Sequence, residues 1–87
     1  MNETGIRATR KRQDWIMVMA ALRVIDETRI ADAVKAMIRQ RPDSDSVTLE
    51  QWGEDGDMLA MAIELADRGR PAHWPAVTIE RLTREVQ

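Results

Sequence analysis

The stretch from Asp14 to Ile25, D-W-I-M-V-M-A-A-L-R-V-I, decides how the rest of the chain must fold. From Trp15 onward, Arg23 is its only residue that is not apolar. Read as a helix, the stretch is apolar on nearly every side, which is typical of a helix that is buried or has a neighbour on each side. Asp14 stands just before the apolar run, where its carboxylate would cap the first turn. The run is too short to cross a bilayer, which takes about 20 apolar residues.

A helical pattern continues beyond this stretch to about residue 40. Ile30, Ala33, Val34 and Met37 form one apolar stripe before Pro42 ends the pattern. Because no glycine or proline interrupts it, we predict one long helix over residues 14–40, with a break at residues 26–28 as the alternative. Two shorter helices are predicted over residues 57–68 and 76–86 from their apolar stripes and their i,i+4 charge pairs.

These patterns predict an all-α fold, a small helical bundle of three main helices. Residues 14–87 would form a single domain, preceded by a flexible basic arm at residues 1–13. The segment Val47–Trp52 is interpreted as a short helical turn. A short strand at Val47–Leu49 is the alternative, although no second strand is evident to pair with it. Trp74 stands one residue before Pro75, and we expect it to anchor its connector to the core.

Charge is distributed unevenly along the chain, whose net charge is −2. Residues 1–42 carry nine Arg or Lys and five Asp or Glu, whereas residues 43–87 carry four Arg and ten Asp or Glu. The basic cluster of the arm is either a set of nucleic-acid contacts or a solvated terminus, and it consists of Arg7, Arg10, Lys11 and Arg12. The acidic half predicts a partner-binding surface that could mimic nucleic acid, consisting of Asp43, Asp45, Glu50, Glu54, Asp55 and Asp57.

A homodimer is expected from the two-sided first helix. A chain of 87 residues has little with which to cover such a helix on both sides, and an uncovered side would expose a large apolar patch. Two-fold pairing is the commonest solution. The predicted seam consists of Met17, Ala21 and Val24, with Asp26 and Arg29 pairing across it or remaining solvated.

The available chemistry argues against an enzyme. There is no cysteine, His73 is the only histidine, and no nucleophile motif or phosphate-binding glycine loop is present. We expect no catalytic residues, no metal site and no cofactor, and we expect a cytoplasmic protein without membrane contact. The hypothesis is a small protein–protein interaction module, acting as an adaptor, inhibitor or regulator of the bacterial or phage accessory kind. A nucleic-acid-binding protein that uses the basic arm and the first helix is the alternative.

Overall fold

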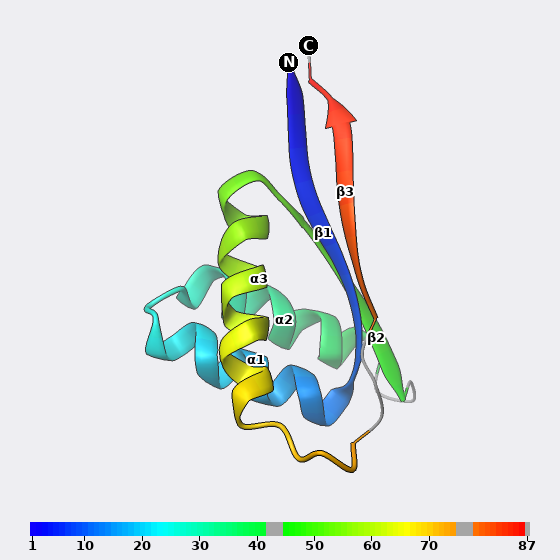
Figure 1. Ribbon diagram of the computed structural model, residues 1–87. Coiled ribbons are helices and arrows are strands. Elements are labelled where there is room, and N and C mark those ends of the chain that lie inside the picture. Colours follow the sequence, from blue (N-terminus) through cyan, green and yellow to red (C-terminus); the bar gives the residue numbers. More distant parts are fainter. Residues whose placement is uncertain (42–44, 75–77, 87) are drawn as a thin grey trace.

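The computed structural model describes residues 1–41, 45–74 and 78–86 and shows an α+β fold (Figure 1). Its elements are, in chain order, β1 (Asn2–Lys11), α1 (Arg12–Val24), α2 (Thr28–Gln40), β2 (Ser46–Trp52), α3 (Gly53–Arg68) and β3 (Thr78–Glu85). The strands form one antiparallel sheet in the order β2-β1-β3. The helices lie on one side of this sheet. The prediction of an all-α helical bundle is therefore wrong.

The segment that was expected to be a flexible arm contains the central strand of the sheet. In β1, Ile6, Ala8 and Arg10 are buried on the helical side, and the residues between them belong to the opposite face. This is the period of two that a half-buried strand requires. β1 is therefore part of the folded domain, and among the described residues it pairs with both other strands of the sheet.

Two further segments differ from the predicted elements. Val47 and Leu49 are buried on the helical side of the strand β2, so Val47–Trp52 is not a helical turn. The helix predicted over residues 76–86 is wrong from Thr78 onward, because Thr78–Glu85 is the strand β3, paired with β1 along its whole length. Residues 76 and 77 of that prediction lie outside the described residues.

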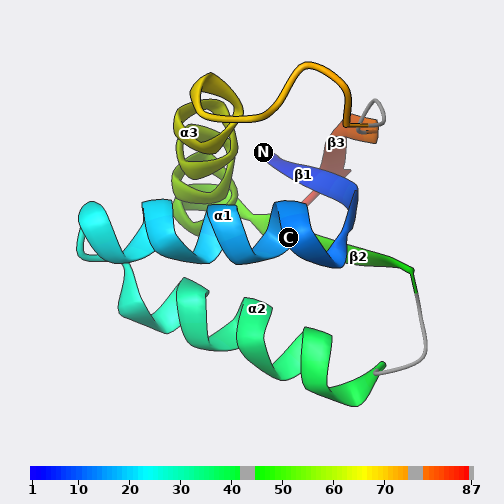
Figure 2. The ribbon, with the colours of Figure 1, turned by 90° about the horizontal axis from the view of Figure 1, so that it is seen from below.

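The long first helix is broken into α1 and α2. Asp26 adopts a left-handed backbone conformation, with φ of 64°, which ends α1 and turns the chain so that α2 returns beside it (Figure 2). α1 then contacts α2, α3 and β1. The apolar character of residues 15–25 on nearly all sides is therefore satisfied largely within one chain, although Ile16 and Val24 remain exposed.

Trp15 and Asp14 attach α1 to other elements. Trp15 is 1% exposed, and its Nε1 donates to the carbonyl oxygen of Val47 in β2 at 2.8 Å. Asp14 does not cap α1, which begins two residues earlier at Arg12. Instead its buried carboxylate accepts a hydrogen bond from Nε of Arg70 at 3.1 Å.

The prediction of residues 57–68 as a helix is confirmed within α3, which begins four residues earlier than expected. Gly53 follows β2 directly with φ of 62° and allows the chain to turn at once from strand to helix. A Cβ atom on Gly5 would lie 2.7 Å from the Gln51 carbonyl oxygen, and one on Gly56 would lie 2.8 Å from the same atom. The two glycines therefore permit β1, β2 and α3 to meet closely at this point.

Candidate interaction surface: the open face and the free edge of the sheet

One face of the sheet is covered by none of the helices in the described part of the chain. The register places the side chains of Arg7, Glu50 and Glu80 in one row across this face, and those of Thr9 and Thr48 in the next. Gly5, Trp52 and Leu82 form a third row on the other side of Arg7. We call these residues, with Glu3 and Arg84, the open face.

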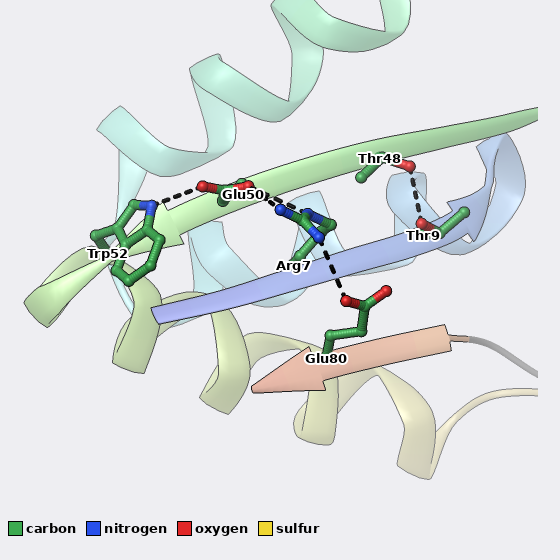
Figure 3. Close-up of polar contacts among 6 residues, drawn as sticks. All are labelled: Arg7, Thr9, Thr48, Glu50, Trp52 and Glu80. Atoms are coloured by element: carbon green, nitrogen blue, oxygen red, sulfur yellow. Dashed lines mark hydrogen bonds and ion pairs between the residues drawn. The ribbon is translucent and has the colours of Figure 1, made fainter. Parts of the chain in front are cut away.

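Arg7 is at the centre of a network of charge-assisted hydrogen bonds on the open face (Figure 3). It donates to one carboxylate oxygen of Glu50 from Nε at 3.1 Å and from Nη2 at 3.0 Å, and to Glu80 from Nη1 at 3.3 Å. The other carboxylate oxygen of Glu50 accepts from Trp52 Nε1 at 2.8 Å. The hydrogen bonds from Trp52 and Arg7 hold the pKa of Glu50 below its ordinary value.

The Trp52 ring lies beside Gly5, which has no side chain to displace it. On this ring lies the guanidinium of Arg84, 4.0 Å from the ring centroid, and the same guanidinium donates to Glu3 at 2.8 Å. The open face therefore joins all three strands by side-chain contacts. Its arginine and tryptophan side chains are engaged by groups of the same chain, and it carries three carboxylates against two guanidinium groups.

The outer edge of β3 presents unpaired backbone groups. β1 is the only strand that pairs with β3 among the described residues. The N–H of Val86 donates to Met1 O at 2.9 Å. Pairs that exchange hydrogen bonds alternate with pairs that do not, so the amide groups of Arg84, Leu82 and Glu80 also point toward β1. The N–H and C=O groups of the intervening residues, Ile79, Arg81, Thr83 and Glu85, therefore point away from the sheet.

A groove of about 470 Å³ lies between α3 and β3, beside this edge. It is lined by Asp57, Ala60, Met61, Ile63, Glu64, Asp67, Ile79 and Arg81. Two apolar residues of this lining, Met61 and Ile79, are 51% and 41% exposed. Three carboxylates against one guanidinium make its rim acidic. The free edge and this groove together form a surface with main-chain donors, main-chain acceptors and adjacent apolar side chains.

The basic residues proposed as nucleic-acid contacts are not gathered on one surface. Arg7 is held by two carboxylates, and Arg12 donates to the carbonyl oxygen of Arg41 at 2.7 Å. Lys11 is exposed at the end of β1. The Arg10 side chain is 1% exposed and is paired with Asp67. Burial lowers the pKa of Arg10, and the neighbouring carboxylate of Asp67 partly opposes this shift.

The acidic residues proposed as a partner-binding surface are also dispersed. Asp43 lies outside the described residues. Glu50 is on the open face, whereas Asp55 is paired with Arg29. Asp57 lines the groove beside β3. The remaining two, Asp45 and Glu54, are exposed before β2 and in the first turn of α3.

The residues of the predicted dimer seam lie in different environments. Ala21 is 7% exposed and belongs to the core, so a second chain cannot reach it in this fold. Met17 is partly buried against the core, and Val24 is 79% exposed at the end of α1. Asp26 is exposed in the turn that follows, and Arg29 binds Asp55 of the same chain. These five residues do not form one continuous apolar surface.

Sequence reasoning did not identify β3, the groove or Trp52 as parts of a site. The alternation in Val47–Trp52 was a usable signal for β2, but its pairing partner was hidden in the supposed arm. Trp74, expected to be an anchor, is only partly buried.

The described residues contain no group of three or more His, Asp or Glu that could hold a metal ion. No helix among them is long and apolar enough to cross a membrane.

No protein-family model matches the chain, and neither curated proteins nor solved structures show significant similarity to it.

Proposed function

We propose that the protein is a small non-enzymatic protein-interaction module that binds its partner by strand addition at the free edge of β3. The observation that carries this proposal is the row of outward-directed N–H and C=O groups on Ile79, Arg81, Thr83 and Glu85. An extended chain that pairs with such an edge gains affinity from main-chain hydrogen bonds. Its alternate side chains gain specificity from pockets beside the edge, and the groove between α3 and β3 is such a pocket.

The edge of β3 lacks several of the protections that soluble sheet proteins give an exposed strand, and the one that it has is its charged side chains, Glu80, Arg81, Arg84 and Glu85. Edge strands are commonly shortened, interrupted by a bulge or proline, or covered by another element. β3 runs from Thr78 to Glu85 with an unbroken register and without proline. α3, its nearest helix, packs against β1 and β2. A long, regular and accessible edge of this kind favours a docking role.

The proposal is tested with a generic extended probe, a synthetic peptide of alternating leucine and lysine. Its lysines would face the acidic rim of the groove, and its backbone would pair with β3. In a nuclear magnetic resonance titration, we expect the largest shift changes at the amides of Arg81, Thr83 and Glu85. Changes centred on α2, or no changes at a protein concentration at which the chain is monomeric and β3 is unoccupied, would contradict the proposal.

Two variants at one position make this test specific. Thr83→Pro removes the outward N–H, and proline is tolerated in an edge strand at such a position. Thr83→Ala shortens the side chain but keeps the N–H. We expect the proline variant to weaken peptide binding about 10-fold more than the alanine variant, since each lost main-chain hydrogen bond is worth about 0.5–1.5 kcal/mol and the ring also obstructs its neighbours. Equal binding by the two variants would exclude strand addition.

A further inference from the structure

We infer that the partner at this edge is a second copy of the chain, whose β3 pairs antiparallel with the first in a register centred on Leu82. The inference rests on the proposed function, because it names the occupant of the same edge. Two such chains would be related by a two-fold axis perpendicular to the sheet. They would join their sheets in the order β2-β1-β3-β3-β1-β2.

The charge pattern of β3 favours this register. With Leu82 opposite its counterpart, Glu80 of each chain stands opposite Arg84 of the other, and Arg81 stands opposite Thr83. The outward-directed residues Arg81 and Thr83 then exchange main-chain hydrogen bonds, as antiparallel pairing requires. Opposite charges in directly facing positions stabilise a strand pair. Glu80 is paired with Arg7 and Arg84 with Glu3 in the same chain, but both side chains are about half exposed, so a second chain can still reach them.

Neighbouring registers are less favourable. The pairing must keep side chains of one face together, so the register can shift only in steps that move the centre by one residue. A centre at Arg81 places this arginine opposite its own copy, and a centre at Glu80 does the same for two glutamates. Like charges in these positions are destabilising. A centre at Thr83 exchanges the pairs of Glu80 with Arg84 for pairs of Arg81 with Glu85, but it shortens the paired segment from residues 79–85 to residues 81–85 and so loses main-chain hydrogen bonds.

The helices leave room for this arrangement. The two-fold axis places the helices of both chains on the same side of the joined sheet. α3 packs against β1 and β2 and leaves the groove above β3. Ile79, which is 41% exposed in one chain, would lie beneath the space shared by the two grooves. The second copy would thus cover apolar surface that one chain leaves in contact with water.

Sedimentation equilibrium of the full chain tests the inference. We expect a dimer at about 100 μM, well above the micromolar range of ordinary specific association. Glu80→Arg and Arg84→Glu should each raise the dissociation constant at least 10-fold, because each places like charges opposite one another twice. An equimolar mixture of the two variants restores opposite charges at every such pair. It should form a mixed dimer with a dissociation constant within about 3-fold of the wild type.

Matched variants separate association from folding. Glu80→Gln and Arg84→Gln remove the same contacts within the chain without creating like charges, and they should weaken association less than the reversals. Lys35→Glu on α2 changes the net charge by the same amount as Arg84→Glu and should leave association unchanged. Circular dichroism verifies that each variant is folded.

Three results would overturn the inference: a folded wild-type monomer at about 100 μM, a Thr83→Pro variant that associates as well as Thr83→Ala, or a mixture of the charge reversals that fails to recover. A monomer that still binds the leucine–lysine peptide at β3 would refute self-pairing and leave the proposed function standing. If the Thr83→Pro variant remains a stable dimer and the protein does not bind the peptide at β3, then both self-pairing at β3 and the proposed function are refuted.

Discussion

Gly5→Ala should destabilise the protein, although strand propensity alone predicts the opposite. Glycine in a strand interior normally weakens the strand, and replacing it by alanine also lowers the entropy of the unfolded chain, a gain of about 0.4–1 kcal/mol. At this position, however, the added Cβ would lie 2.7 Å from the Gln51 carbonyl oxygen and 2.7 Å from ring atoms of Trp52. Both distances are shorter than van der Waals contact allows.

The magnitude follows from the two opposing terms. Overpacking by a methyl-sized group costs about 1–3 kcal/mol. The Gln51 oxygen belongs to the backbone close to α3 and β1, so the upper part of that range applies. After the unfolded-state gain is subtracted, the net loss is about 1–2 kcal/mol. For a domain of this size, that loss lowers the melting temperature by about 5–15 °C.

Thermal and urea unfolding, followed by circular dichroism, measure this change. Gly69→Ala is the matched control, because its Cβ would meet only Met17 Cε at 3.6 Å and Ala66 O at 3.8 Å. It should be neutral or slightly stabilising. In a Trp52→Ala background, Gly5→Ala should cost less but still be destabilising, since the contact with Gln51 remains. A Gly5→Ala variant as stable as Gly69→Ala would refute the close approach of β1 and β2 described here.

Three further predictions concern other parts of the fold. Trp15→Phe should lower the free energy of unfolding, measured in urea, by about 1–3 kcal/mol, because the carbonyl of Val47 loses a buried donor. Because the folded-state pKa of Glu50 is lowered, the stabilisation it provides is present above its ordinary pKa of 4.5 and is lost as the pH falls further. Urea unfolding at a series of acidic pH values should therefore show a smaller decline in the free energy of unfolding for Glu50→Gln than for the wild type. Asp26→Val should destabilise by about 1–2 kcal/mol in the same urea assay, because a β-branched residue is strained at φ of 64°, whereas Asp26→Gly should cost less.

The helical residues were largely predictable from local patterns. The apolar run after Trp15 and the stripe through Leu59 and Ala62 each have a helical period that depends only on near neighbours in the sequence. The break at Asp26 was less accessible, because a left-handed aspartate leaves no glycine or proline as a signal. The buried position of Trp15 follows from the same periodicity, but its hydrogen bond to Val47 does not.

The strands could not be predicted in the same way, because their stability comes from partners far along the chain. In β1, a buried arginine occupies the third inward position after Ile6 and Ala8, so the hydrophobic alternation is short. In β3, the pairs Glu80–Arg84 and Arg81–Glu85 have helical spacing as well as strand spacing. Only the pairing with β1 decides between the two, and that pairing is not visible in either segment alone.

The candidate site was missed for the same reason. The acidic and basic clusters were defined by nearness in the sequence, whereas the fold disperses them and brings Arg7, Glu50 and Glu80 together from three strands. The interpretation of residues 76–86 as a helix also hid the free edge of β3. A helix pairs its own backbone N–H and C=O groups, whereas an edge strand leaves half of them unpaired.

The pairing of β1 with β3 also has a kinetic consequence. The bond from Val86 N to Met1 O joins residues from nearly opposite ends of the sequence, and the whole β1–β3 ladder is similarly non-local. Such contacts slow folding, since a long loop must close before they form. A circular permutant that links the two ends and opens the chain between Gly69 and Trp74 would convert β3 and β1 into a hairpin. The permutant should fold faster than the unpermuted protein and keep the same sheet. In the unpermuted protein the β1–β3 ladder closes the longest loop, whereas in the permutant it would be formed between neighbouring segments.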